Sequence, residues 1–306
     1  MLFLISGGGS ALSVYPNSIS LRDKILVNQE LIRSGANINE IACVRKHLSL
    51  IKGGRLTQNM NCKGISFVVS DVIGDDITSI SSGMTSYDKS TFTDALKILK
   101  KFSLQHKLPN STLSILKSGV NGNIPETPKK AIIKNTIILN NSTCLLKMKD
   151  KSKKLGYKTQ LISNITGNLD QVTQMIASKA ITSKNNCIIF GGEPTVNVTG
   201  NGKGGRNQEL VLRLYEKLKH KKPDFTFASI GTDGIDGNTK FAGSIFSTKH
   251  NYDGHLYLNN NDSSSFFKKF GGLIKTGITQ NNVNDIGVII RPVSYTHLTL
   301  PTILLV

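Results

Sequence analysis

The chain has 306 residues, enough for two ordinary domains or one large domain with a sizeable core. Hydrophobic residues make up 38% of it and charged residues 19%, which is typical of a soluble globular protein, and no apolar run is long enough to span a membrane. The formal net charge of +18 could attract nucleic acid or an anionic metabolite, but aromatic residues are sparse and no basic helix is sustained, so we expect neither a nucleic-acid nor a membrane partner.

The first part of the chain predicts a buried strand, a glycine-rich loop and two helices. Leu2–Ile5 is apolar and suits a strand. The loop that follows can cradle a phosphate or a carboxylate, and it consists of Ser6, Gly7, Gly8, Gly9 and Ser10. A tight turn that serves packing alone explains these residues equally well. Ser20 is expected to cap a helix that runs through Ser34, and a second helix is expected from about Asn39 to Gly53.

A strand at Gly64–Val69 leads into an acidic loop with Asp71, Asp75 and Asp76. Hard cations such as Mg²⁺ bind through one or two carboxylates together with substrate phosphates, so this loop could hold a metal–nucleotide complex. Asp71 could instead act as a general base towards a substrate hydroxyl. A cluster of Asx turns and helix caps is the structural alternative.

Strands and helices continue to alternate in the rest of the chain. Further helices are expected at 90–103, 111–118, 141–155, 168–183 and 206–221, and further strands at 136–140, 157–162, 187–190, 195–199 and 225–230. This alternation predicts an α/β fold with mainly parallel sheets flanked by helices, in which ligands bind beyond the carboxyl ends of the strands. The loop after the last of these strands carries Asp233 and Asp236, which could orient a substrate or a cation or belong to a plain turn.

The segment Gly200–Glu209 lies between a predicted strand and a predicted helix and carries four glycines, Lys203 and Arg206. Glycines let an anion approach backbone N–H groups, and a helix start favours negative charge, so we predict a phosphate-handling loop. Three of the glycines formally satisfy a dinucleotide-binding pattern, but Asp224, which has the spacing of the ribose-binding acid, precedes its strand instead of ending it. A Walker loop would need Lys and Ser or Thr where Arg206 and Asn207 stand.

Two domains are predicted, with the seam near Lys184. The first spans residues 1–184 and the second 185–291, while residues 292–306 change character abruptly and are interpreted as a non-native tail. A core strand at the very start needs neighbours, so we expect a further segment to precede it. The four cysteines are scattered without metal-ligand spacing, which favours a reducing, cytoplasmic location.

Six motifs follow one another along the chain. They are Leu4-Ile-Ser-Gly-Gly-Gly-Ser-Ala11, Val44-Arg-Lys-His-Leu-Ser-Leu-Ile-Lys-Gly-Gly-Arg55, Ser70-Asp-Val-Ile-Gly-Asp-Asp76, Gly191-Gly-Glu193, Gly202-Lys-Gly-Gly-Arg-Asn-Gln-Glu209 and Gly231-Thr-Asp-Gly-Ile-Asp-Gly237. In this order they resemble the class II glycerate 2-kinases, whose C-terminal half is a MOFRL domain. The resemblance runs from about residue 2 to residue 290.

The resemblance implies phosphorylation of D-glycerate to 2-phosphoglycerate with ATP and Mg²⁺. It also implies a Rossmann-like first α/β domain, incomplete here, a second of the MOFRL type, and an active site between them. On this basis we assign Arg206, which lies in the motif of the family's catalytic arginine, and Asp71 to catalysis. Residues assigned to the substrate or its phosphates are Ser6, Gly7, Gly8, Gly9, Ser10, Arg45, Lys52, Glu193, Lys203, Gly204, Gly205 and Asn207. Residues assigned to the metal are Asp75, Asp76, Asp233 and Asp236.

The chain also departs from the family pattern. The family's active-site lysine lies in a segment of roughly a hundred residues before the glycine-rich loop, and no residue here matches it. Ile73 stands where the family has proline, and Met84 interrupts its Ser-Gly-Pro-Thr sequence. Other hypotheses remain open: a nicotinamide-dependent hydroxypyruvate reductase, a non-enzymatic module that binds anions or nucleic acid, and an inactive fragment of the kinase.

Overall fold

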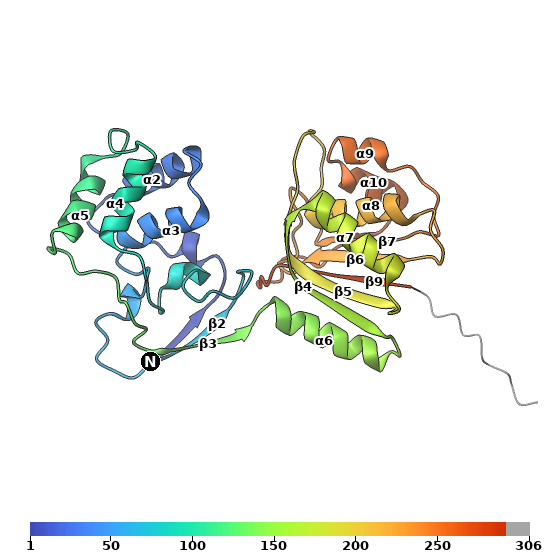
Figure 1. Cartoon of the computed structure of the whole chain (residues 1–306), viewed down its shortest axis with the longest axis horizontal. Helices are drawn as coiled ribbons and strands as arrows, with labels where there is room; N and C mark the ends of the chain where they lie inside the picture. The colour runs from blue at the N-terminus through green and yellow to red at the C-terminus, as the bar shows by residue number, and fades with distance from the viewer. Residues whose placement is uncertain (292–306) are drawn as a thin grey trace, which may run out of the picture. The chain divides into compact units, whose positions relative to one another are not determined.

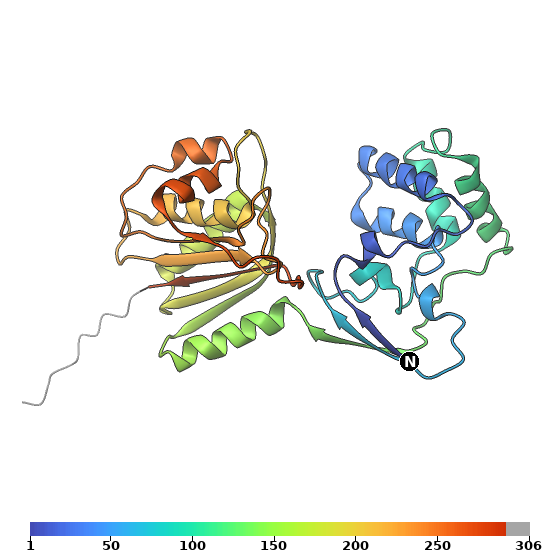
Figure 2. The same cartoon turned by 180° about the vertical axis from the view of Figure 1, so that it is seen from behind.

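The computed structural model describes residues 1–291, and the tail predicted at 292–306 lies outside this range. The chain divides into two compact units (Figure 1; seen from behind in Figure 2). Within the described residues, unit 1 comprises Met1–Asn140 and Asn281–Val283, and unit 2 comprises Asn141–Gln280 and Asn284–Arg291. Within the described range, no helix has the length and apolar character needed to traverse a lipid bilayer.

Unit 1 is built on a three-stranded parallel sheet in the order β1-β2-β3. The strands are β1 (Leu2–Ile5), β2 (Ile65–Val69) and β3 (Lys134–Leu139), and the helices are α1 (Gly9–Leu12), α2 (Leu21–Arg33), α3 (Ile38–His47), α4 (Phe92–Lys101) and α5 (Asn110–Val120). Two 3₁₀ turns, Arg55–Thr57 and Ile80–Gly83, lie in the connections. Helices α2 to α5 bury an apolar core that includes Leu31, Val44 and Phe92.

Local sequence signals account for the start of α3. The Asn37 side chain accepts the backbone N–H of Glu40 at 3.0 Å, and the Glu40 carboxylate accepts the N–H of Asn37 at 2.9 Å, which together form a capping box. The helix ends at His47 and not near Gly53, because the residues that follow pair with the segment preceding α2. The predicted continuation to Gly53 is therefore wrong.

Unit 2 is built on a six-stranded sheet in the order β4-β5-β9-β6-β7-β8. Its strands are β4 (Thr159–Asn168), β5 (Cys187–Thr195), β6 (Thr226–Gly231), β7 (Gly243–Ser247), β8 (Leu273–Ile274) and β9 (Asp285–Ile290). Its helices are α6 (Asn141–Lys154), α7 (Leu169–Thr182), α8 (Arg206–Leu218), α9 (His255–Asn259) and α10 (Ser263–Phe270). Helix α6 covers one face of the sheet, and α7 and α8 cover the other (Figure 1).

The predicted α/β class with helix-flanked sheets is confirmed, and the strand directions differ between the units. Both strand pairs of unit 1 are parallel. In unit 2, β4 and β5 are parallel, but β9 runs antiparallel to both of its neighbours, and β7 runs antiparallel to β6 and β8. The prediction of mainly parallel sheets thus holds for unit 1 and for the β4–β5 pair. It does not extend to the other strand pairs of unit 2, because β9 lies between β5 and β6 and runs antiparallel to both.

Two predicted boundaries differ from the structure. The division between the units falls between Asn140 and Asn141, not near Lys184, because β4 pairs with β5 and α6 packs on the same sheet. The strand predicted at 195–199 is not formed: β5 ends at Thr195, opposite the last residue of its partner β4. The segment before the Gly200–Glu209 loop is therefore irregular.

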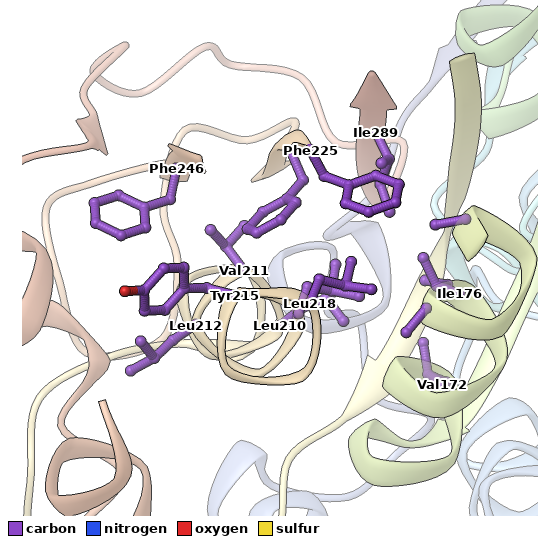
Figure 3. Packing of buried hydrophobic residues seen from close by; sticks show 14 of the residues in the cluster. Val172, Ile176, Leu210, Val211, Leu212, Tyr215, Leu218, Phe225, Phe246 and Ile289 are labelled. Atoms are coloured by element: carbon purple, nitrogen blue, oxygen red, sulfur yellow. The ribbon is translucent and has the colours of Figure 1, made fainter. Parts of the chain in front are cut away.

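The core of unit 2 is centred on α8 (Figure 3). Tyr215 is fully buried, and its ring lies 4.9 Å from that of Phe246 in an edge-to-face arrangement. The Tyr215 hydroxyl accepts the backbone N–H of Tyr252 at 2.6 Å and donates to the Tyr252 carbonyl at 3.0 Å. This packing fixes α8 against the sheet and thereby fixes the position of its first residue, Arg206.

The Tyr215 hydroxyl is expected to contribute measurably to stability. Tyr215→Phe keeps the ring in the core but leaves the Tyr252 N–H without its acceptor, so the free energy of unfolding should fall by about 1–2 kcal/mol. Denaturant unfolding measures this, with Tyr15→Phe as the control because Tyr15 is 59% exposed. The control should change stability by less than about 0.5 kcal/mol. Equal losses in both variants would contradict the role assigned to the Tyr215 hydroxyl.

Candidate functional site

The glycine-rich loop after β1 lies in close contact with other loops of unit 1. Gly8 has a left-handed φ of 81°, which favours glycine. A Cβ atom on Gly7 would lie 2.4 Å from Oδ2 of Asp71, and one on Gly9 would lie 2.5 Å from the hydroxyl oxygen of Ser81. The lack of side chains at these positions therefore lets the Asp71 carboxylate and the Ser81 hydroxyl lie directly against the loop.

A strained turn supports both ends of this loop. Ser81 and Ser82 are buried and have left-handed φ values of 49° and 58°. A residue with a side chain in this conformation costs about 1–3 kcal/mol, so surrounding contacts must hold it. The Ser81 hydroxyl donates to the Ser6 carbonyl at 2.6 Å, and the hydroxyl oxygens of Ser82 and Ser10 are 2.7 Å apart.

Three cations, Lys24, Arg45 and Lys52, gather where the loop ends, and we call them the cationic cluster. Nη2 of Arg45 donates to the Ser10 carbonyl at 2.6 Å, and Nζ of the buried Lys52 donates to the same oxygen. Burial first, and then repulsion from Arg45 and Lys24, lower the pKa of Lys52 to about 7. Burial also lowers the pKa of Lys24, whose Nζ atom has no hydrogen-bond partner within the described residues.

The cationic cluster is suited to an anion. Within residues 1–291, the ion pairs of unit 1 involve other cations, so no carboxylate offsets the charge of these three. Desolvated positive charge without a counter-ion is unfavourable, and a bound phosphate or carboxylate would relieve it. Lys24 was not among the residues that we predicted for this site from the sequence. The available signal was its helical phase, because it shares the buried face of α2 with Val27 and Leu31.

The acidic loop after β2 does not converge into a three-carboxylate site. Asp76 accepts hydrogen bonds from Thr78 and Ser79, and these outweigh the opposing effect of burial and lower the pKa of Asp76. Oδ2 of Asp75 accepts the side-chain amide of Asn140 at 2.6 Å. Among the described residues, the one group of three metal-ligating side chains with donor atoms within 4.8 Å of one another lies elsewhere, at Glu216, Asp253 and His255.

In the Gly200–Glu209 loop of unit 2, the backbone N–H groups of residues 200–204 are not free, contrary to our prediction. The N–H groups of residues 200–204 donate to Asn238 and to residues 260–262 at 2.9–3.1 Å. A Cβ atom on Gly200 or Gly202 would lie 2.4 Å from the Asn260 carbonyl oxygen. The glycines thus allow two loops to pack closely. Lys203 and Gly204 were predicted to bind phosphate, but their backbone N–H groups already donate to the side chains of Asp262 and Asn238.

Asp236 caps α8 from a distant loop. Its Oδ1 accepts the backbone N–H of Asn207 at 3.0 Å, its Oδ2 accepts that of Gln208 at 2.8 Å, and both side-chain amides add a hydrogen bond. Burial raises the pKa of Asp236, and these hydrogen bonds oppose the rise. A capping role therefore replaces the metal role predicted for Asp236, and Asn207 belongs to the cap. Gly205 packs against it, since a Cβ atom there would lie 2.3 Å from Cγ of Asp236.

Asp233, the other acid predicted in this loop, is placed differently. Its Oδ1 accepts the backbone N–H of Ile235 at 3.0 Å, the pattern of an Asx turn. Unlike Asp236, it is not buried. Asp233 therefore remains the carboxylate of this loop that an external cation could reach.

Arg206, the first residue of α8, is held by two carboxylates. Its Nε and Nη2 donate to Asp285 at 2.6 and 3.1 Å, and its Nη1 donates to Glu193 at 2.9 Å. Burial acts to lower the pKa of Arg206, but the two carboxylates raise it above its ordinary value, so the guanidinium stays charged. Glu193 was predicted as a site residue and Asp285 was not. The available signal was an acid directly before the apolar run of β9.

Comparisons with known proteins agree with one another. Residues 1–117 match a family described as "Domain of unknown function (DUF4147)", and residues 186–285 match the "MOFRL family". The glycerate 2-kinase of Pyrococcus horikoshii is 35% identical over 95% of this chain and 70% of its own length. The D-glycerate 2-kinase of Thermotoga maritima is 38% identical over 95% of this chain and 72% of its own length.

Solved structures give the same result. The crystal structure of a glycerate kinase from Thermotoga maritima aligns with a TM-score of 0.86 at 36% identity, over 95% of this chain and 72% of that one. The crystal structure of the PH0495 protein from Pyrococcus horikoshii aligns with a TM-score of 0.82 at 35% identity, over 95% of this chain and 71% of that one.

Replacing Asp236 tests its capping role. Asp236→Asn places an amide NH₂ against N–H donors, so the free energy of unfolding should fall by about 1–3 kcal/mol for each buried donor left without a partner. Denaturant unfolding measures the loss. Asp224→Asn removes the same charge from an exposed ion pair with Lys222 and should have little effect. Unchanged stability of the Asp236 variant would contradict the cap.

Proposed function

Because the chain belongs to the glycerate 2-kinase family, we propose that it transfers a phosphoryl group from ATP to D-glycerate and forms 2-phosphoglycerate. The observation that supports this best is the charged guanidinium of Arg206, which is 33% exposed at the start of α8 within the segment that matches the MOFRL family. We also propose a cytoplasmic location, which four unpaired cysteine thiols favour.

Arg206 would act on the transferring phosphoryl group. Phosphoryl transfer places little covalent chemistry on the protein, and catalysis depends on positioning and on stabilisation of the negative charge that spreads over the equatorial oxygens. A planar guanidinium can donate to two of these oxygens at once and remains charged at any physiological pH. The carboxylates of Asp285 and Glu193 orient it before substrate arrives.

The cationic cluster and the Ser6–Ser10 loop would hold an anionic group of D-glycerate or ATP. The binding energy comes from relief of the desolvated charges of Lys24, Arg45 and Lys52, which lack a carboxylate partner within the described chain. Asp71, whose carboxylate lies against Gly7, would take the proton of the attacking hydroxyl.

Carboxylates suited to Mg²⁺ occur in both units. Asp75 follows β2, and Asp233 follows β6, and each offers hard oxygen donors of the kind that Mg²⁺ prefers. Asp76 and Asp236 fit less well, because their oxygens already accept several hydrogen bonds. We propose that Asp75 or Asp233 holds the ion, which would neutralise phosphate charge when bound.

The catalytic role of Arg206 predicts a large loss of turnover in Arg206→Lys, because lysine keeps the charge but loses the planar fork. The turnover number should fall by about 10²–10³-fold. A coupled assay that separates 2-phosphoglycerate from 3-phosphoglycerate measures both the rate and the product.

Arg213→Lys is the matched control. Arg213 lies on the same helix and is also held between a buried and an exposed carboxylate, Glu209 and Asp170. Its charge-conserving replacement should leave turnover little changed. Near-normal turnover of Arg206→Lys would contradict the role of Arg206. Oxidation of a reduced nicotinamide with hydroxypyruvate, without glycerate phosphorylation, would contradict the proposed function.

The lowered pKa of Lys52 predicts that anion binding in unit 1 depends on pH. Because the pKa of Lys52 in the free protein is about 7, its ammonium is charged below pH 7 and neutral above it. An anion that needs this charge must then bind together with a proton. Affinity for sulfate, whose own charge is constant in this range, should fall by up to about tenfold per pH unit above pH 7.

Calorimetric titration with sulfate between pH 6 and 9 measures this dependence. Lys52→Met should remove the slope, whereas Lys63→Met, a replacement of an exposed lysine in the same unit, should keep it. The same slope in wild type and Lys52→Met would show that the cationic cluster does not bind the anion.

A further inference from the structure

The two carboxylates that hold Arg206 differ in burial and in geometry. Asp285 is 7% exposed and accepts from both Nε and Nη2, whereas Glu193 is 44% exposed and accepts from Nη1 alone. One edge of the guanidinium is therefore bound inside the protein, and the other is paired at the surface.

We propose that Asp285 is a positioning residue that fixes Arg206. We also propose that the Glu193 carboxylate occupies an anion-binding position at Nη1 of Arg206, from which a tetrahedral dianion displaces it. This inference rests on the proposed function for the identity of the natural anion, a phosphoryl group. The exchange itself requires only that an anion reach Nη1 of Arg206.

Asp285 has the rigidity that a positioning residue needs. It begins β9, the strand between β5 and β6, and lies opposite Gly192 on one side and Gly231 on the other. Its backbone carbonyl accepts the side-chain amide of Asn141 at 2.9 Å. Both carboxylate oxygens are bound by Arg206 in the bidentate arrangement that restricts a guanidinium most strongly. An incoming anion cannot easily displace such a pair.

Glu193 has the opposite properties. It lies near the end of β5, and its single contact with Arg206 is exposed to water, where such a pair changes an equilibrium by only about two- to fivefold. Its Oε2 accepts the side-chain amide of Asn284 at 3.1 Å. That second contact does not involve Arg206, so it can persist when Nη1 changes partner. A dianion offers more charge to Nη1 than a carboxylate does, which favours the exchange.

Removal of the competing carboxylate should therefore tighten anion binding. In Glu193→Gln the neutral amide keeps the shape of the side chain but no longer competes, and sulfate should bind about two- to fivefold more tightly at Arg206. The Nε–Hε NMR signal of Arg206, identified by its absence from Arg206→Lys, reports binding at this site alone and separates it from binding in unit 1.

Asp170→Asn is the matched control. It removes an exposed carboxylate from Arg213 of the same helix and changes the net charge equally. It should leave the sulfate affinity measured at Arg206 unchanged. An unchanged or weaker affinity in Glu193→Gln, or an equal gain in Asp170→Asn, would overturn the role of Glu193.

The positioning role of Asp285 can be tested separately, through the pH dependence of sulfate affinity at Arg206. The ionisable groups that face it are Arg206 and Asp236, and burial raises the pKa of Asp285 to about 6 in spite of Arg206. As pH falls through 6, protonation should loosen the guanidinium, so the sulfate affinity at Arg206 should decrease. Asp285→Asn should bind sulfate more weakly at pH 8 and should lose this pH step. A retained step in Asp285→Asn would overturn the positioning role.

These measurements are independent of turnover. If the protein failed to phosphorylate glycerate but Glu193→Gln still bound sulfate more tightly at Arg206, the proposed function would fall and the exchange would stand. If glycerate were phosphorylated and Glu193→Gln bound sulfate no better than wild type, the proposed function would stand and the exchange would fall.

Discussion

The start of α8 depends on the compensation of two buried carboxylates, Asp236 and Asp285. A carboxylate removed from water is strongly unfavourable unless it is paired or accepts several hydrogen bonds. Asp236 is compensated by the N–H groups at the helix N-terminus, and Asp285 by the guanidinium of the first helical residue, Arg206. One helix end therefore satisfies both acids. Because the core around Tyr215 fixes α8, the direction of the guanidinium follows from packing beneath it.

Unit 1 presents the opposite electrostatic situation. Lys24, Arg45 and Lys52 are partly or fully removed from water, and none of the described carboxylates pairs with them. The loop beside them is held by Ser81 and Ser82. Both serines have left-handed backbone conformations, which are unfavourable for residues with a side chain. Strain and uncompensated charge in one place lower the stability of the free protein, and a ligand of opposite charge recovers part of that cost. Such features concentrate at binding sites for this reason.

Much of the fold could be predicted because it is encoded locally. Most helices and strands lie close to their expected positions, and the capping box of Asn37 and Glu40 is visible in the sequence. The prediction failed where distant segments intervene. The glycines at 200–205 have the spacing of an anion-binding loop, yet in the structure their lack of side chains lets residues 260–263 and Asp236 pack closely against them. No local pattern distinguishes a glycine that admits a ligand from one that admits another loop.

The sequence by itself determined the α/β class and the family, because ordered motifs and hydrophobic periodicity are properties of short segments. Only the tertiary structure decided which groups compensate each charge. Asp285 is 79 residues from Arg206, and Asp236 is 29 residues from Asn207, so neither partnership leaves a periodic trace in the chain. Lys24 joined the cationic cluster for the same reason, since the fold, and not spacing, carries α2 beside Arg45. Charge compensation is a matter of distance in space, and a sequence records only distance along the chain.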